Sequence, residues 1–173
     1  LACMFTFMKF ARITTAMQGV IHAEIAYQGA LPYAKERLSM RSLSGTKNPT
    51  GPADPIIVHP DVRRMLMTIK AIAEGSRSLV YFASQHLDIA EYSENTKAKE
   101  GAEQLLSLIT PICKGFLTEL GVEAANLGLQ VLGGHGYIRE SGMEQNVRDS
   151  RISTIYEGTT GIQALDLLGR KVL

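Results

Sequence analysis

Glu157 is the residue of this sequence best placed to do chemistry, because it lies in a glycine-rich turn at the expected start of a helix. It belongs to the stretch 130–163, which holds six of the sixteen glycines. Two glycine-rich turns, at 133–136 and 157–161, bracket a short polar segment. Glycine permits positive φ and lets another molecule approach the backbone closely. The pattern is therefore typical of a site rather than of a simple connection.

Two roles are open for the Glu157 carboxylate. An acid at the start of a helix complements the positive end of the helix dipole, which is a structural role. The chemical alternative is a general base, with neighbouring backbone N–H groups free to polarise a carbonyl group. The residues around Glu157 do not by themselves decide between the two roles.

Other common chemistries find no support in the sequence. The four histidines and two cysteines fall in no metal-ligand spacing, so we expect no metal site. Residues 134–136 resemble part of a dinucleotide-binding fingerprint, but that motif must follow a strand and here it follows a predicted helix. No Gly-x-Ser-x-Gly elbow is present.

Helical spacing of apolar residues dominates the chain and predicts an all-α protein. Helices are expected over 3–40, with a kink at Pro32, over 60–92, and from about 96 to 132, with a kink at Pro111. Large apolar residues of the third helix are expected to form its buried stripe: Leu105, Ile109, Ile112, Phe116, Leu120, Leu127 and Val131. Gly133 and Gly134 should stop that helix, and shorter helices should cover 143–150 and 158–173. Packing of these helices predicts an antiparallel helical bundle.

Composition narrows the class of protein. The 173 residues, 45% of them apolar, are enough for one domain with a buried core. A net charge of +1 gives no reason to expect nucleic acid as a partner. Two cysteines far apart favour a reducing, cytoplasmic location. No apolar run approaches the ~20 residues of a membrane span, so we expect none.

Three motifs then resemble the C-terminal domain of acyl-CoA dehydrogenases. They are Tyr-Ala-Lys-Glu-Arg at 33–37, Gln-Val-Leu-Gly-Gly-His-Gly-Tyr at 130–137, and Val-Arg-Asp-Ser-Arg-Ile at 147–152 followed by Ile-Tyr-Glu-Gly-Thr at 155–159. The loop at 41–60 resembles a longer subgroup of that family that includes 3-methylmercaptopropionyl-CoA dehydrogenase. The resemblance covers almost the whole chain and implies the fold of that family's C-terminal domain, an antiparallel up-and-down four-helix bundle.

The resemblance implies dehydrogenation of an acyl-CoA thioester between its α and β carbons, with FAD as hydride acceptor. Glu157 would take the α-proton, and its backbone N–H would be a donor to the developing enolate oxygen. Some members place the base just before the residue that matches Arg12. That position is Ala11 here, which leaves Glu157 as the candidate. Arg12 and Gly158 would contact the substrate, although a lone helix arginine is often a surface ion-pair partner.

The resemblance also assigns seven residues to FAD. They are Arg37 at the pyrophosphate, Gln130, Gly133 and Gly134 at the adenosine end of a flavin held mainly by a neighbouring subunit, Thr159 and Gly161 beside the flavin near Glu157, and His59. Each type of contact has a structural alternative. Arg37 could be a solvated residue at a helix end, the glycine pair a helix cap, Thr159 an N-cap and His59 an ordinary loop residue.

The implied partners are acyl-CoA, electron-transfer flavoprotein and further copies of the chain in a dimer or tetramer. The chain lacks an initiator Met and would correspond to one domain, 1–173, without the family's N-terminal helical and middle β domains. We therefore expect the isolated chain to bind FAD weakly or not at all and to show no turnover. Two alternatives are an acyl-CoA oxidase, which passes flavin electrons to oxygen, and a non-catalytic helical module that serves oligomerisation.

Overall fold

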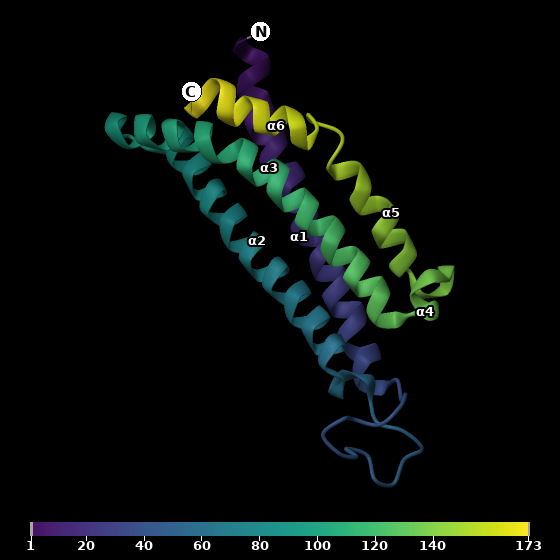
Figure 1. Cartoon of the computed structure of the whole chain (residues 1–173). Helices are drawn as coiled ribbons and strands as arrows, with labels where there is room; N and C mark the ends of the chain where they lie inside the picture. Colours follow the sequence, from purple (N-terminus) through teal and green to yellow (C-terminus); the bar gives the residue numbers. More distant parts are fainter. Residues whose placement is uncertain (1, 173) are drawn as a thin grey trace.

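The computed structural model describes residues 2–172 and contains helices but no strands within them. Three long helices are followed by three shorter ones (Figure 1). Short 3-10 segments cover Ile56–Val58 and Arg139–Ser141, and a π-helix covers Leu168–Val172. The α-helices are α1 Ala2–Glu36, α2 Pro60–Tyr92, α3 Thr96–Leu132, α4 Gly134–Tyr137, α5 Met143–Ser153 and α6 Thr160–Leu167. The all-α prediction is confirmed.

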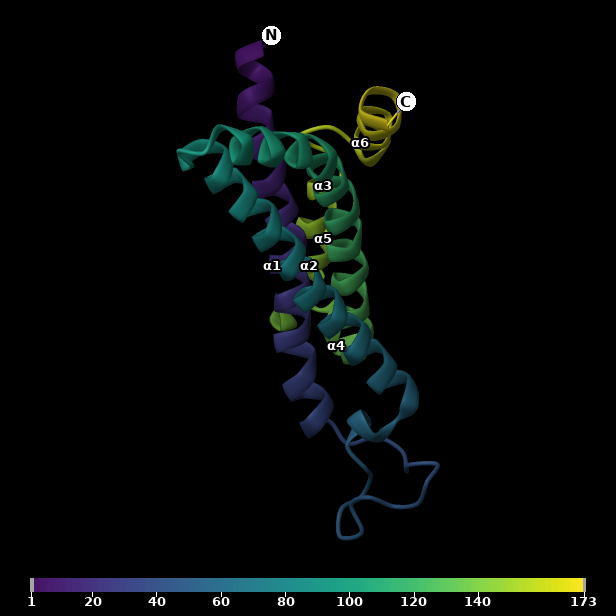
Figure 2. The same ribbon diagram turned by 90° about the vertical axis from the view of Figure 1, so that its left-hand side faces the viewer.

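The helices form an up-and-down bundle in which α1 and α3 run in the same direction, while α2 and α5 run the opposite way (Figure 1). The fourth position of the bundle is shared, because α5 packs on α1 and α3 and α6 packs on α3. The loop between α1 and α2 projects beyond one end of the bundle, away from both chain termini (Figures 1 and 2).

Small residues let α1 and α3 pack backbone against backbone. A Cβ atom added to Gly121 would lie 2.6 Å from the Gly19 Cα, and one added to Gly128 would lie 2.8 Å from the Ala26 Cβ. Ala23 and Ala124 are fully buried in the same part of the core. The two helices are thus held by close contact of small residues, and larger apolar side chains pack around this line.

The predicted apolar stripe of the third helix is only partly correct. Ile109 and Val131 are buried, but Phe116 is 56% exposed and Ile112 is also exposed. The buried face instead carries Cys113 and Leu117 together with the small residues that contact α1. The spacing of large apolar residues does not identify the buried face of α3, because two closely packed helices need small side chains where they touch.

Several helix ends differ from the predicted ones. The first helix ends at Glu36 rather than at residue 40, because the next residues pair with the far side of the loop: the Ser39 N–H donates to Asp54 O and the Asp54 N–H donates to Met40 O, both at 2.9 Å. Gly133, with φ of 59°, ends α3 as predicted, but Gly134 opens α4 instead of continuing the stop.

The last two predicted helices are also shifted. The helix expected over 158–173 begins at Thr160, its α-helical part ends at Leu167, and residue 173 lies outside the described residues. The helix expected over 143–150 extends to Ser153.

By length and composition, α3 meets the criterion for a membrane-spanning helix, contrary to the sequence-based expectation that no segment would. Half of its most apolar 18-residue stretch is buried inside the bundle. The core helix of a soluble bundle meets the same criterion, and α3 contacts α1, α2, α5 and α6.

Candidate functional site

The candidate residues lie in two groups at opposite ends of the bundle (Figure 1). The first group surrounds the α5–α6 turn: Arg12, Glu157, Gly158, Thr159 and Gly161. The second lies where α1 and α3 end and α2 begins: Arg37, His59, Gln130, Gly133 and Gly134. On α3, Gly115 packs against Gln163 of α6. Gly133 lies 18 positions after Gly115, which corresponds to about 27 Å along the helix axis at ~1.5 Å per residue. One chain therefore presents two separate half-sites.

Glu157 lies in a left-handed turn. Its φ is 56° and that of the following Gly158 is 88°. A non-glycine residue with positive φ is uncommon and costs roughly 1–3 kcal/mol, so surrounding contacts must hold it. The Glu157 side chain is half-buried, and within residues 2–172 its backbone N–H forms no hydrogen bond. A carboxylate and a nearby free N–H donor are what a base with carbonyl polarisation requires.

Two buried side chains hold this turn from the bundle side. The Lys114 Nζ donates to Gly158 O at 2.6 Å, and the Gln163 Nε2 donates to Glu157 O and Gly158 O, both at 3.1 Å. Lys114 and Gln163 are 0% and 2% exposed. Burial lowers the pKa of Lys114, while the carboxylates of Glu119 and Glu157 act in the opposite direction.

Sequence reasoning missed both of these side chains. The sequence does carry a signal for Lys114: it is the single charged residue between Glu103 and Glu119 in a predicted helix. An isolated charge in an apolar helical segment has to find a polar partner when the helix is buried. No comparable signal marks Gln163.

Arg12 joins α1 to α6 through an ion pair. Its Nη1 lies 2.8 Å from the Asp166 Oδ2, and the two side chains are only 15% and 13% exposed. Asp166 is also 3.7 Å from Arg170. The pair borders a cavity of about 260 Å³ that Lys9 and Lys171 also line. The ion-pair alternative considered for Arg12 is therefore present in the structure, and its predicted contact with substrate stays a prediction.

Thr159 acts as the N-cap of α6. Its Oγ1 accepts from the Ile162 N–H at 3.4 Å, so the structural alternative for this residue is observed. The helix begins one residue later, which places Glu157 outside the first helical turn. Gly161 is exposed, and a Cβ there would meet only the Thr159 Oγ1, at 3.9 Å. The backbone at Gly161 is open to an approaching molecule.

At the other end of the bundle the glycine pair is similarly open. Gly133 and Gly134 are exposed, and a Cβ added at either position would meet no atom within 4 Å. Gln130, three residues earlier, is also exposed. Tyr33 packs on His135 with a ring-centroid distance of 5.9 Å, which ties the end of α1 to α4.

Arg37 follows directly after α1 at this end of the bundle. Its side chain is exposed, and within residues 2–172 the guanidinium forms no ion pair. It could contact an anionic group that approaches the end of the helix.

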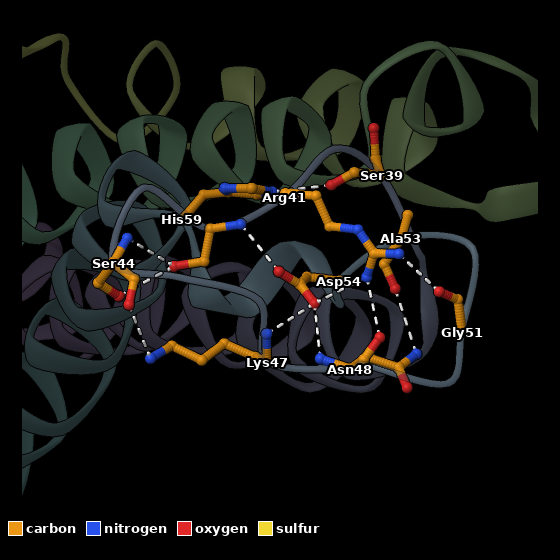
Figure 3. Close-up of polar contacts among 10 residues, drawn as sticks. Ser39, Arg41, Ser44, Lys47, Asn48, Gly51, Ala53, Asp54 and His59 are labelled. Atoms are coloured by element: carbon orange, nitrogen blue, oxygen red, sulfur yellow. Dashed lines mark hydrogen bonds and ion pairs between the residues drawn. The ribbon is translucent and has the colours of Figure 1, made fainter.

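The loop between α1 and α2 is built around Asp54 (Figure 3). This carboxylate is fully buried and accepts from the backbone N–H groups of Ser42, Lys47 and Asn48 at 2.6–2.9 Å. The Ser42 N–H, with those of Asn48 and Lys47 and the Arg41 guanidinium, lowers the pKa of Asp54 to about 2.

His59 closes the base of this loop, with its Nε2 2.9 Å from Ser39 O (Figure 3). The structural alternative for His59 is thus observed, and its contact with FAD stays a prediction. Across the described part of the chain, no group of three metal-ligating side chains comes together.

Comparison with known proteins identifies related chains. The family model described as acyl-CoA dehydrogenase, C-terminal domain, matches residues 1–173. The chain is 49% identical over 170 residues to 3-methylmercaptopropionyl-CoA dehydrogenase of Ruegeria pomeroyi, covering 98% of this chain and 28% of that protein. It is 37% identical over 175 residues to a broad-specificity linear acyl-CoA dehydrogenase of Mycobacterium tuberculosis, again 28% of that protein.

A solved structure has the same fold. Butyryl-CoA dehydrogenase from Megasphaera elsdenii superposes with a TM-score of 0.71 at 25% identity, covering 94% of this chain and 36% of that one. The chain spans less than a third of the length of the first two relatives.

Proposed function

The chain belongs to the acyl-CoA dehydrogenase family, whose C-terminal domain it matches, and we propose that it supplies the catalytic base of an FAD-dependent enzyme that dehydrogenates an acyl-CoA thioester. The left-handed turn at Glu157 is the observation that carries this proposal. A carboxylate held there at a conformational cost, by two buried side chains, is difficult to explain as a mere complement to a helix dipole. Glu157 also precedes the N-cap of α6, so it lies outside the first helical turn, in which the helix dipole acts most strongly.

Glu157 would remove the α-proton of the thioester and hold it on its carboxylate. A positioned base contributes roughly 10²–10⁴-fold to such a step, so polarisation of the thioester carbonyl must contribute as well. The Glu157 N–H, which forms no hydrogen bond within the described residues, is a suitable donor to that oxygen. FAD, when bound, supplies the acceptor for the β-hydride.

The open glycine backbones fit a bound nucleotide cofactor. Gly161 and Thr159 would lie beside FAD near Glu157, whereas Gln130, Gly133, Gly134 and Arg37 would meet the adenosine and pyrophosphate of a second FAD. The length of α3 between Gly115, which packs on α6, and Gly133 is about 27 Å and supports this division. We therefore propose a homo-oligomer, a dimer or tetramer, in which each FAD lies between two copies of the chain.

Arg12 and Gly158 are the proposed substrate contacts. Electron-transfer flavoprotein is the proposed electron acceptor, and the proposed location is the cytoplasm. An acyl-CoA oxidase has the same base but releases peroxide. A non-catalytic oligomerisation module would not require the Glu157 turn.

The experiment uses the full-length, flavin-loaded protein. A saturated acyl-CoA should bleach the flavin absorbance of the wild type and of a Glu144→Gln control on α5, but not that of Glu157→Gln. Unchanged bleaching in Glu157→Gln would remove Glu157 as the base. Peroxide release instead of reduction of electron-transfer flavoprotein would identify an oxidase.

A further inference from the structure

Lys114 is the largest fully buried side chain of the described residues, and the reaction proposed above gives it no role. It lies in the middle of α3 and forms no ion pair within residues 2–172. Its ammonium group instead donates to a backbone carbonyl, Gly158 O, at 2.6 Å. Burying a charge without an ionic partner is costly, so this contact calls for a compensating role.

The contact is made to the peptide between Gly158 and Thr159, one residue beyond Glu157. Gly158 O accepts from Lys114 and from Gln163, and Glu157 O accepts from Gln163. Two successive carbonyl groups are therefore fixed by donors on two different helices. Because these carbonyls flank the Gly158 backbone, holding both of them fixes the turn and, with it, the direction of the Glu157 side chain.

The conformation of the turn is unfavourable unless these donors hold it. Both of its residues have positive φ, and for Glu157 this conformation is unfavourable. A Cβ at Gly158 would lie 2.7 Å from the Gln163 Nε2, so the donor packs directly against the turn. A hydrogen bond from a charged donor is roughly twice as strong as one from a neutral donor, which favours a lysine at this position.

We propose that Lys114, together with Gln163, is a positioning residue that holds the left-handed turn from which Glu157 presents its carboxylate to the substrate. Lys114 acts through Glu157, so the inference rests on the proposed function of that residue. Its direct consequence is a structural one: removing the ammonium group should loosen residues 156–163 whether or not Glu157 is the base.

The first measurement is amide hydrogen exchange in the full-length, flavin-loaded protein. In Lys114→Met, which keeps an unbranched side chain one atom shorter and removes the ammonium group, exchange at Ile162 and Gln163 should rise by about 10–100-fold, the change expected when a hydrogen bond to a charged group is lost. Exchange in α5 should not change. The matched control is Thr118→Val, because the Thr118 hydroxyl is equally buried and bonds only to carbonyls of its own helix.

The second measurement separates positioning from packing. Lys114→Met should slow bleaching of the flavin by substrate at least tenfold, a larger factor than any rise in the Kd for acyl-CoA. Gln163→Met should give the same pattern, and it decides the matter if Lys114→Met does not fold. Exchange in the turn no faster than in Thr118→Val would overturn the inference. Bleaching that persists in Glu157→Gln, with a loosened turn in Lys114→Met, would instead overturn the proposed base and leave the positioning contact standing.

Discussion

The contact between Gly19 and Gly121 predicts that adding a single methyl group at Gly121 lowers the stability of the protein strongly. In Gly121→Ala the new Cβ would lie 2.6 Å from the Gly19 Cα and 3.0 Å from the Gly19 O. Both atoms belong to the backbone of α1, so no side-chain rotation can relieve the overlap. The two helices must separate, which also loosens the neighbouring contact between Gly128 and Ala26.

The magnitude follows from two opposing terms. Overpacking a well-packed core costs roughly 1–3 kcal/mol, and the upper end applies because the clash is with backbone. Alanine in place of glycine gains about 1 kcal/mol of helix propensity. The expected net loss is about 2 kcal/mol, which for a domain of this size lowers Tm by roughly 4–8 °C.

The control is Gly75→Ala on α2. Gly75 is exposed, and a Cβ there would meet no atom within 4 Å, so only the propensity gain of about 1 kcal/mol should remain. Urea unfolding followed by far-UV circular dichroism measures both variants. Equal stability of Gly121→Ala and Gly75→Ala would show that α1 and α3 do not pack backbone against backbone.

Two further predictions concern the loop and α6. The pKa of Asp54 is lowered from 3.8 to about 2, so its contribution to stability is present above about pH 4 and lost as the pH falls towards 2. Asp54→Asn should therefore destabilise the protein at pH 7 and remove the loss of stability that the wild type shows between about pH 4 and pH 2. An identical dependence of Tm on pH in the variant and the wild type would contradict this prediction. Thr159→Ala should cost about 1 kcal/mol through loss of the N-cap, whereas Thr159→Ser should cost little, and urea unfolding compares them.

The helices were predictable because their signals are local. Pro60 and the acid at Asp61 mark the start of α2, and Gly133 marks the end of α3. Predictions failed where tertiary contacts decide. Phe116 belongs by spacing to an apolar stripe, yet it is exposed because small residues on the adjacent face bring α1 close.

The candidate site was predictable in part for the same reason. The glycine turns and Glu157 are visible in the sequence, and the motifs around them point to the family. The positive φ of Glu157 has no signal in the sequence, and one of the donors to the turn is Lys114, 43 positions before Glu157, which no local pattern connects to it. The buried Asp54 is similar, because its donors come from the folded loop.

Removal of the substrate α-proton by Glu157 can be measured without following electron transfer. The full-length, flavin-loaded protein is incubated with an acyl-CoA in D₂O, and loss of the α-proton signal is followed by NMR. We expect the wild type and Glu144→Gln to exchange the α-proton, and Glu157→Gln to do so at least about 10²-fold more slowly. Exchange at the wild-type rate in Glu157→Gln would contradict the assignment of Glu157 as the base.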